Sequence, residues 1–261
     1  MNFLDKSWTD LPKGINRATK YPYDAPNESF LLDQGILKPL TNTFHLEKKI
    51  PILAIGSNRS PSQLLRKFGE KETVAVTDVI IKNFDVIYAS LISYYGAVPA
   101  TLWPVKGSEV KLSIIWLSSS QLEKMHETEA VGKAYDFVEF DYQLLNFKSS
   151  YNIQGNIYGY VAKFGALNFN LLDFEVKALS AIKAKKRLIR SINQQKAIKF
   201  VANKIINAKS KKDTILFMDK VISDKKFRLQ VNKRLNRIAV QPQSLPWKII
   251  NTIQTNSLKF Y

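Results

Sequence analysis

The stretch IPILAIGSNRSPSQLLRKF, residues 50–68, contains the signals of a strand, a tight loop and the start of a helix. Residues 50–55 are mainly β-branched or apolar and end at a glycine, which is typical of a buried strand. Gly56 lets the chain turn without a Cβ clash, and Asn58 tolerates left-handed backbone conformations. The stretch therefore predicts a strand that passes directly through a Gly-Ser-Asn loop into a helix.

The helix after this loop begins with capping residues. Ser60 has the position of an N-cap, Pro61 stands at the first helical position and Gln63 completes a capping box. The loop Ile55–Arg59 would then aim main-chain N–H groups and the positive end of the helix dipole at one point, which suits a carboxylate or phosphate. On spacing alone, a well-built turn without a ligand is the stronger interpretation, because such loops are common.

A second informative helix is expected over residues 118–129. Leu122, Met125, His126 and Glu129 follow one another at spacings of three and four, so they share one face. A carboxylate on an apolar face is expected to be paired, to be solvated at a cleft, or to have a raised pKa. The plainer alternatives are a frayed helix end that turns Glu129 to water, and a core histidine at position 126 whose hydrogen bonds are satisfied.

The remaining pattern indicates a strand-rich body followed by helices. Turn sequences at 82–83 and 106–108 separate the expected strands in the body. From residue 174 the apolar period changes to 3.6, which indicates helices. We expect α+β class, with a mixed sheet curled into a barrel, flanking helices and a helical C-terminal region. The expected strands are 73–81, 84–93, 99–103, 110–117, 135–147 and 153–164, and the expected helices are 174–188, 192–206, 214–222, 225–238 and 247–253, with caps at Ser191, Ser210 and Ser223.

Charge is distributed unevenly along the chain. Residues 181–261 carry 20 lysines and arginines against three aspartates, so the whole net charge of +17 lies there. We expect three units: an N-terminal segment 1–49 packed on the core, a domain 50–173 and a basic helical region 174–261. A lysine-rich solvated surface is the favoured interpretation of residues 181–261, and weak binding of a polyanion is the alternative.

Composition also narrows the functional classes. The chain has no cysteine, two histidines and no run of apolar residues as long as a membrane span. No spacing resembles a set of metal ligands, and no P-loop, dinucleotide or nucleophile-elbow motif is present. We therefore expect no metal, no cofactor, no membrane span and a cytoplasmic location.

Three ordered blocks resemble the γ-glutamyl cyclotransferase-like family. The segment IGSNRSPSQL resembles its Y-G-S-N-L motif, and residues 99–116, PATLWPVKGSEVKLSIIW, resemble its A-T-x-x-P-x-x-G-x-E-V segment. Residues 122–135, LEKMHETEAVGKAY, resemble the end of its conserved helix. The resemblance covers roughly residues 50–164. It departs at Ile55, where the family usually has tyrosine, and at Arg59, where leucine is usual.

The resemblance implies the family's fold and an enzymatic activity. By this resemblance Glu129 is the general acid and base, and Ile55, Gly56, Ser57, Asn58 and Arg59 form the loop that binds the acyl or carboxylate group. His126 and Tyr135 are further candidates for substrate binding. The substrate would be a γ-glutamyl or related small amide, whose own α-amine attacks its γ-carbonyl to release 5-oxoproline and a free amine.

Two other functions remain open from the sequence. One is an amide-processing enzyme on the same scaffold, in which Arg59 recognises an additional acidic group. The other is a non-catalytic binding module whose basic helical tail holds an anionic partner. The two enzymatic hypotheses depend on where the Glu129 carboxylate lies relative to the loop that contains Gly56.

Overall fold

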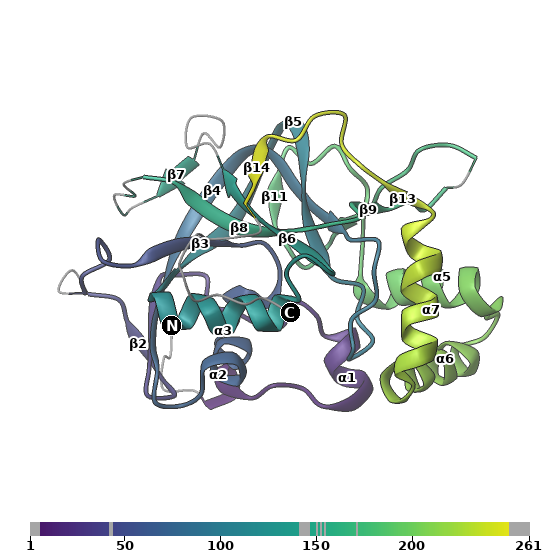
Figure 1. The fold of residues 1–261 in the computed structure, drawn as a ribbon, viewed down its shortest axis with the longest axis horizontal. Helices are drawn as coiled ribbons and strands as arrows, with labels where there is room; N and C mark the ends of the chain where they lie inside the picture. Colours follow the sequence, from purple (N-terminus) through teal and green to yellow (C-terminus); the bar gives the residue numbers. More distant parts are fainter. Residues whose placement is uncertain are drawn as a thin grey trace.

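The protein is of the α+β class, as expected. One large mixed sheet forms the body, three short helices lie beneath it, and three longer helices lie at one side (Figure 1). Strand β3 (Ile50–Ala54) pairs in parallel with β8 (Ile157–Ala162), and β10 (Ala178–Leu179) pairs in parallel with β12 (Ser191–Ile192). The other strand pairs of this sheet are antiparallel. The computed structural model describes residues 6–41, 44–140, 147–149, 151, 153, 155–170 and 172–250.

The centre of the sheet is a long bent hairpin made by β4 (Thr73–Tyr88) and β5 (Ala100–Leu117). The turns predicted at 82–83 and 106–108 are wrong. The register shifts between Lys82 and Phe84, and the side-chain oxygen of Asn83 accepts a hydrogen bond from the Gly107 amide at 2.9 Å. Both residues have positive φ, 63° and 87°, so these turn-forming residues build a bulge that bends two continuous strands.

The predicted buried strand is β3 (Ile50–Ala54), whose last four residues are buried. It lies between β5 and β8 (Ile157–Ala162). Beyond β8 the sheet continues through β6 (Tyr135–Phe140) to β14 (Trp247–Ile249). Part of the strand predicted over 135–147 lies outside the described residues.

The N-terminal segment contributes η1 (Lys6–Thr9), α1 (Gly14–Thr19), β1 (Phe30–Asp33) and β2 (Ile36–Pro39). Strand β1 pairs with β4, and its Phe30 is 1% exposed. This strand is thus joined to the sheet by main-chain hydrogen bonds. The proposed domain boundaries at 49/50 and 173/174 stay predictions.

Helices α2 (Pro61–Phe68) and α3 (Ser119–Glu129) pack together beneath the sheet (Figure 1). Helix α3 begins with a complete capping box between Ser118 and Gln121. Ser60 is the N-cap residue of α2, as predicted, but its hydroxyl contacts Ser62 and caps no main-chain N–H, so the expected capping box does not form.

The C-terminal third departs from its predicted helices at two places. Residues 174–188 form no helix, because β10 (Ala178–Leu179) and β11 (Ala184–Lys185) hydrogen-bond to β4 and β5. The helix predicted over 247–253 is also wrong in its described part, since β14 pairs with β6. The spacing of apolar residues in the sequence does not reveal that these segments lie next to strands with which they can form main-chain hydrogen bonds.

Three helices are confirmed in this region: α5 (Gln194–Ile206), α6 (Lys211–Ser223) and α7 (Lys225–Asn236). Ser210 caps α6 as predicted, whereas Asn193 and Asp224, not Ser191 and Ser223, cap α5 and α7. The remaining short strands are β7 (Phe147–Ser149), β9 (Ala166–Leu167), β12 (Ser191–Ile192) and β13 (Ala239–Val240). Among the described residues, none of the helices has the length and apolar character needed to cross a bilayer.

Candidate functional site

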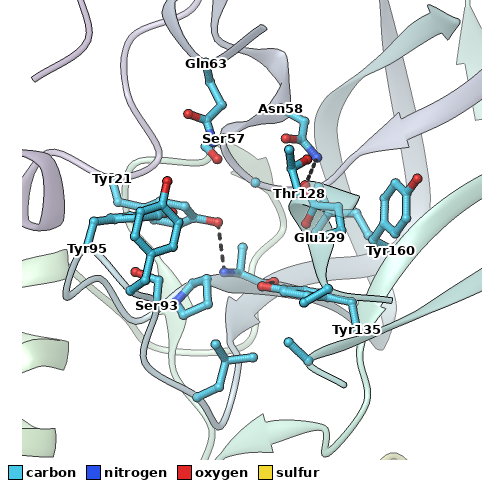
Figure 2. Close-up of a pocket in the computed structure, with 18 of the residues that line it drawn as sticks. Tyr21, Ser57, Asn58, Gln63, Ser93, Tyr95, Thr128, Glu129, Tyr135 and Tyr160 are labelled. Carbon is cyan, nitrogen blue, oxygen red and sulfur yellow. Dashed lines mark hydrogen bonds between the residues drawn. The ribbon is translucent and has the colours of Figure 1, made fainter. Parts of the chain in front are cut away.

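A cavity of about 240 Å³ lies where the loop after β3 meets the end of α3 (Figure 2). Six segments distant in sequence enclose it: the N-terminal segment, the β3–α2 region, the loop before β5, the end of α3 through the start of β6, strand β8 and α7. Of the residues predicted for the site, Ile55, Gly56, Ser57, Asn58, Glu129 and Tyr135 line it.

Glu129 and the Gly-Ser-Asn loop meet in this cavity. Glu129 is the last residue of α3, which ends at Ala130 in the left-handed conformation. The carboxylate oxygen Oε1 accepts a hydrogen bond of 3.0 Å from the side-chain amide of Asn58, 71 residues away in sequence. The Glu129 side chain is 14% exposed. The acid is therefore turned inward, and the alternative of a frayed helix end facing bulk water does not hold.

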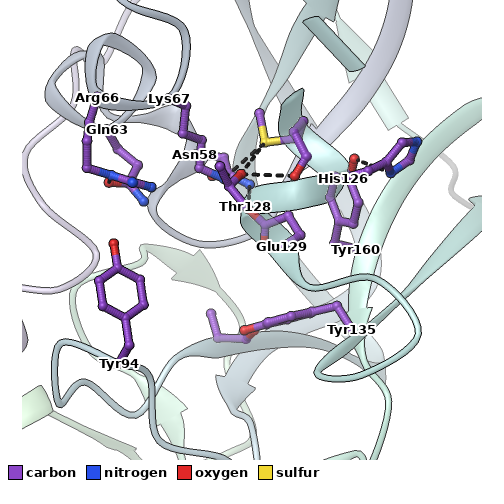
Figure 3. A network of polar contacts seen from close by, with 12 residues as sticks. Asn58, Gln63, Arg66, Lys67, Tyr94, His126, Thr128, Glu129, Tyr135 and Tyr160 are labelled. Carbon is purple, nitrogen blue, oxygen red and sulfur yellow. Dashed lines mark hydrogen bonds and ion pairs between the residues drawn. The ribbon is translucent and has the colours of Figure 1, made fainter. Parts of the chain in front are cut away.

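Sequence reasoning missed the strongest partner of this acid. The ammonium of Lys67, from α2, forms an ion pair with the same Oε1 and also contacts the sulfur of Met125 (Figure 3). The Lys67 side chain is only 1% exposed. Burial lowers the pKa of Lys67, while the neighbouring Glu129 charge raises it. An isolated buried charge would be costly, so each group depends on the other for its placement here.

The two oxygens of the Glu129 carboxylate have different surroundings. Asn58 and Lys67 both contact Oε1. Within the part of the chain that the structure describes, Oε2 receives no hydrogen bond, and neither oxygen accepts one from a main-chain N–H of the loop. The predicted main-chain donors therefore do not hold this acid; a side-chain amide and an ammonium do. Oε2 is left for whatever occupies the cavity.

Gly56 is required by a close approach of Tyr21. A Cβ atom at position 56 would lie 2.1 Å from the hydroxyl oxygen of Tyr21. This oxygen accepts a hydrogen bond of 3.0 Å from the Ala100 amide (Figure 2). The expectation that Gly56 avoids a Cβ clash is therefore confirmed, although its φ is −118°. Asn58 lies in the 3-10 turn η2 (Ser57–Arg59) and does not use the left-handed conformation that it was expected to tolerate.

Tyrosine side chains form much of the remaining wall. The hydroxyl of Tyr135 donates to the Ala100 carbonyl at 3.4 Å. Burial raises the pKa of Tyr135, Tyr95 and Tyr160 well above the usual value, and the charge of Glu129 acts in the same direction. These phenols therefore stay neutral at physiological pH, and the acidic group in the cavity wall is Glu129.

Two predicted site residues lie outside the cavity lining. Arg59 points toward the N-terminal segment, where its guanidinium donates to the Pro26 carbonyl at 3.2 Å. The ring of His126 is 2% exposed and lies behind Tyr160, whose hydroxyl is 3.0 Å from Nδ1 (Figure 3). Burial lowers the pKa of His126 to about 4, partly offset by Glu129. His126 thus corresponds to the core-histidine alternative.

The described residues contain no cluster of three or more histidine, cysteine, aspartate or glutamate side chains arranged to hold a metal. The cavity can support proton transfer at Glu129, combined with hydrogen bonding by amide and phenol groups.

Three solved structures have a distant similarity to this chain. A γ-glutamyl cyclotransferase is 13% identical, with a TM-score of 0.37 over 77% of this chain and 94% of its own. An uncharacterized human protein is 14% identical, with a TM-score of 0.38 over 78% and 94%. An Arabidopsis thaliana protein solved in solution is 14% identical, with a TM-score of 0.33 over 44% and 70%. No protein-family model and no curated protein matches the chain.

Proposed function

We propose that this protein is a γ-glutamyl cyclotransferase-type enzyme in which Glu129 transfers protons. The observation that carries the proposal is the placement of the Glu129 carboxylate. It lies inside a cavity beside the Gly-Ser-Asn loop, and Oε1 is held by Asn58 and Lys67. A carboxylate fixed at one oxygen and open at the other has the geometry of a general base.

The proposed reaction is an intramolecular cyclisation. Glu129 takes a proton from the substrate's α-ammonium group, and the nitrogen then attacks the γ-carbonyl carbon. A C–N bond forms within the new ring as the original amide C–N bond breaks. The attacking nitrogen gives up two protons in all, and the leaving amine gains two. The reaction therefore yields 5-oxoproline and an ammonium product, with neither water nor a net proton consumed.

Other residues of the cavity have supporting roles in this proposal. Lys67 is a positioning residue, because its ammonium contacts Oε1 of Glu129 and fixes the orientation of the carboxylate. The loop Ile55–Asn58 holds the acyl group, and the phenol oxygen of Tyr135, whose proton is donated to the Ala100 carbonyl, is available to accept a hydrogen bond from the substrate. Holding amine and carbonyl in contact would supply the proximity that ring closure needs.

The products formed in labelled water, and the origin of their oxygen atoms, test the proposed reaction. The protein is incubated with a γ-glutamyl amide in ¹⁸O-labelled water, and the products are analysed by mass spectrometry. Cyclisation gives unlabelled 5-oxoproline and one equivalent of amine. Hydrolysis would instead give glutamate with ¹⁸O in its γ-carboxylate, and absence of both products across neutral and acidic amides would refute an amide-cleaving enzyme.

The second candidate is the non-catalytic module that binds an anionic partner. Its supporting observation is that the lysines of α5, α6 and α7 are exposed. Binding through these lysines would weaken steeply with salt, because counterions are released from a polyanion. A titration with nucleic acid at two salt concentrations tests it, and no binding at low salt would remove this candidate.

A further inference from the structure

One wall of the cavity is formed by the loop between β4 and β5. Five consecutive residues of this loop line the cavity, and we call them the wall loop: Leu91, Ile92, Ser93, Tyr94 and Tyr95. The pairing of β4 with β5 ends at Tyr88 and Ala100, so the wall loop extends beyond the strand ladder. Its position at the cavity therefore depends on contacts other than sheet pairing.

Helix α7 supplies the contact that fixes the main chain of the wall loop. The side-chain oxygen of Asn232 accepts a hydrogen bond of 2.7 Å from the Ile92 amide, and its nitrogen donates to the Ile92 carbonyl at 3.1 Å. Ile92 is 1% exposed, and buried main-chain N–H and C=O groups each need a partner. A single side-chain amide thus takes the place that a neighbouring strand would otherwise have.

Helix α7 is itself held firmly against the sheet and against α6. The hydroxyl of Ser90, which directly precedes the wall loop, donates to the Leu235 carbonyl at 2.8 Å. The guanidinium of Arg228 donates to the carbonyls of Val221 and Ile222 at the end of α6. Arg228 and Asn232 are four residues apart on α7, and both line the cavity. This face of the helix therefore belongs to the cavity wall.

The opposite side of the wall loop contacts the N-terminal segment. Arg17 of α1 donates to the Tyr94 hydroxyl at 2.7 Å, and its guanidinium carbon lies 4.4 Å from the centre of the Tyr95 ring. These contacts hold two side chains, whereas Asn232 holds the main chain. Asn232 therefore has the greater influence on the path of the wall loop.

We infer that α7 is part of the candidate site and that Asn232 is a positioning residue, which keeps the wall loop at the cavity. This inference rests on the proposed function for its kinetic consequence. It gives the basic C-terminal region a role besides the binding of an anionic partner, because the face of α7 that carries Asn232 completes the cavity while the lysines of the helix are exposed.

Hydrogen–deuterium exchange tests the positioning without any substrate. In Asn232→Ala the Ile92 amide loses its acceptor, so its exchange should become at least about tenfold faster. The matched control is Asn203→Ala on α5, which removes a side-chain hydrogen bond to the Ala208 carbonyl and lies outside the cavity wall. This control should leave the exchange of the wall loop unchanged.

Steady-state kinetics with γ-glutamylalanine test the consequence for the site. Asn232→Ala should raise KM by about tenfold and change kcat by less than about twofold, because the wall loop contacts the substrate while Glu129 keeps its partners. Asn203→Ala should keep both constants. Asn232→Asp keeps the shape of the side chain but loses the donor to the Ile92 carbonyl, so it should change exchange and KM in the same direction if Asn232→Ala does not fold.

Two outcomes would overturn the inference. One is wild-type exchange of the wall loop in the folded Asn232 variants, and the other is a fall in kcat at unchanged KM. If the wild-type protein converts no γ-glutamyl amide, the proposed function fails by itself. The exchange experiment then decides about Asn232: faster exchange confined to the Asn232 variants supports its positioning role, and equal exchange in all variants refutes it.

Discussion

Two buried ion pairs differ in whether their carboxylate lines the cavity: that of Arg187–Asp85 does not, and that of Lys67–Glu129 does. Arg187 contacts both oxygens of Asp85 at 2.8 Å, and the Val86 amide donates to Oδ1 of the same carboxylate. Asp85 is 0% exposed and takes no part in the cavity wall. Lys67 and Asn58 instead hold only Oε1 of Glu129, which lines the cavity. A carboxylate bound at both oxygens is a structural link, whereas one with a free oxygen beside a cavity is available for chemistry.

The largest effect on stability is expected at the ion pair between Arg187 and Asp85. Arg187→Met leaves Asp85 charged and buried without its partner, which should lower the free energy of unfolding by about 3–5 kcal/mol. Chemical denaturation measures this change. The control is Lys38→Met at the exposed Lys38–Asp33 pair, where the expected loss is about 0.2–1 kcal/mol. Equal losses at the two pairs would contradict the structural role of Arg187.

Removing the cation that contacts Glu129 should slow the reaction. In Lys67→Met the carboxylate keeps its hydrogen bond from Asn58 but loses the ammonium that fixes Oε1. We expect kcat/KM to fall by about 10²-fold, because a misplaced catalytic group loses the proximity that the reaction needs. Lys124→Met, on α3 but in the exposed pair with Glu72, is the matched control and should keep the wild-type rate. A folded Lys67→Met variant with the wild-type kcat/KM would mean that Lys67 does not position Glu129.

His126, one turn before Glu129, should contribute to the pH dependence of stability. Its pKa is lowered by burial to about 4, whereas an unfolded histidine titrates near 6.5. The unfolded chain therefore binds the extra proton first as the pH falls. The contribution is complete above pH 6.5 and is lost toward pH 4, by about 3 kcal/mol. Unfolding free energies measured between these pH values should fall less steeply for His126→Phe; identical slopes would disprove the assignment.

The sequence predicted one side of the cavity better than the other. Spacing on α3 placed Glu129 on a buried face, and the strand–loop–helix order around Gly56 is confirmed. Lys67 was missed, although it continues the buried stripe of Ser60 and Leu64 at helical spacing. A lysine on such a stripe indicates a buried partner, but it does not identify an acid 62 residues away.

Long-range pairing explains the errors in the fold. Asn83 and Gly107 have the residue types of turns, and only their mutual hydrogen bond shows that they bend one continuous hairpin. Residues 178–179 become a strand because Ala178 pairs with Ile87 of β4. Likewise the contact between Tyr21 and Gly56 joins two segments whose separate patterns give no sign of it.

The central claim is that the Glu129 carboxylate, which has one oxygen free of hydrogen bonds among the described residues, performs the proton transfer. The most direct measurement is the rate of 5-oxoproline release by Glu129→Gln, which keeps the size of the side chain and removes its basicity. Circular dichroism and the unfolding midpoint should first establish that the variant is folded. We predict a fall in kcat/KM of about 10²–10⁴-fold. A folded Glu129→Gln variant that releases 5-oxoproline at the wild-type rate would contradict the account.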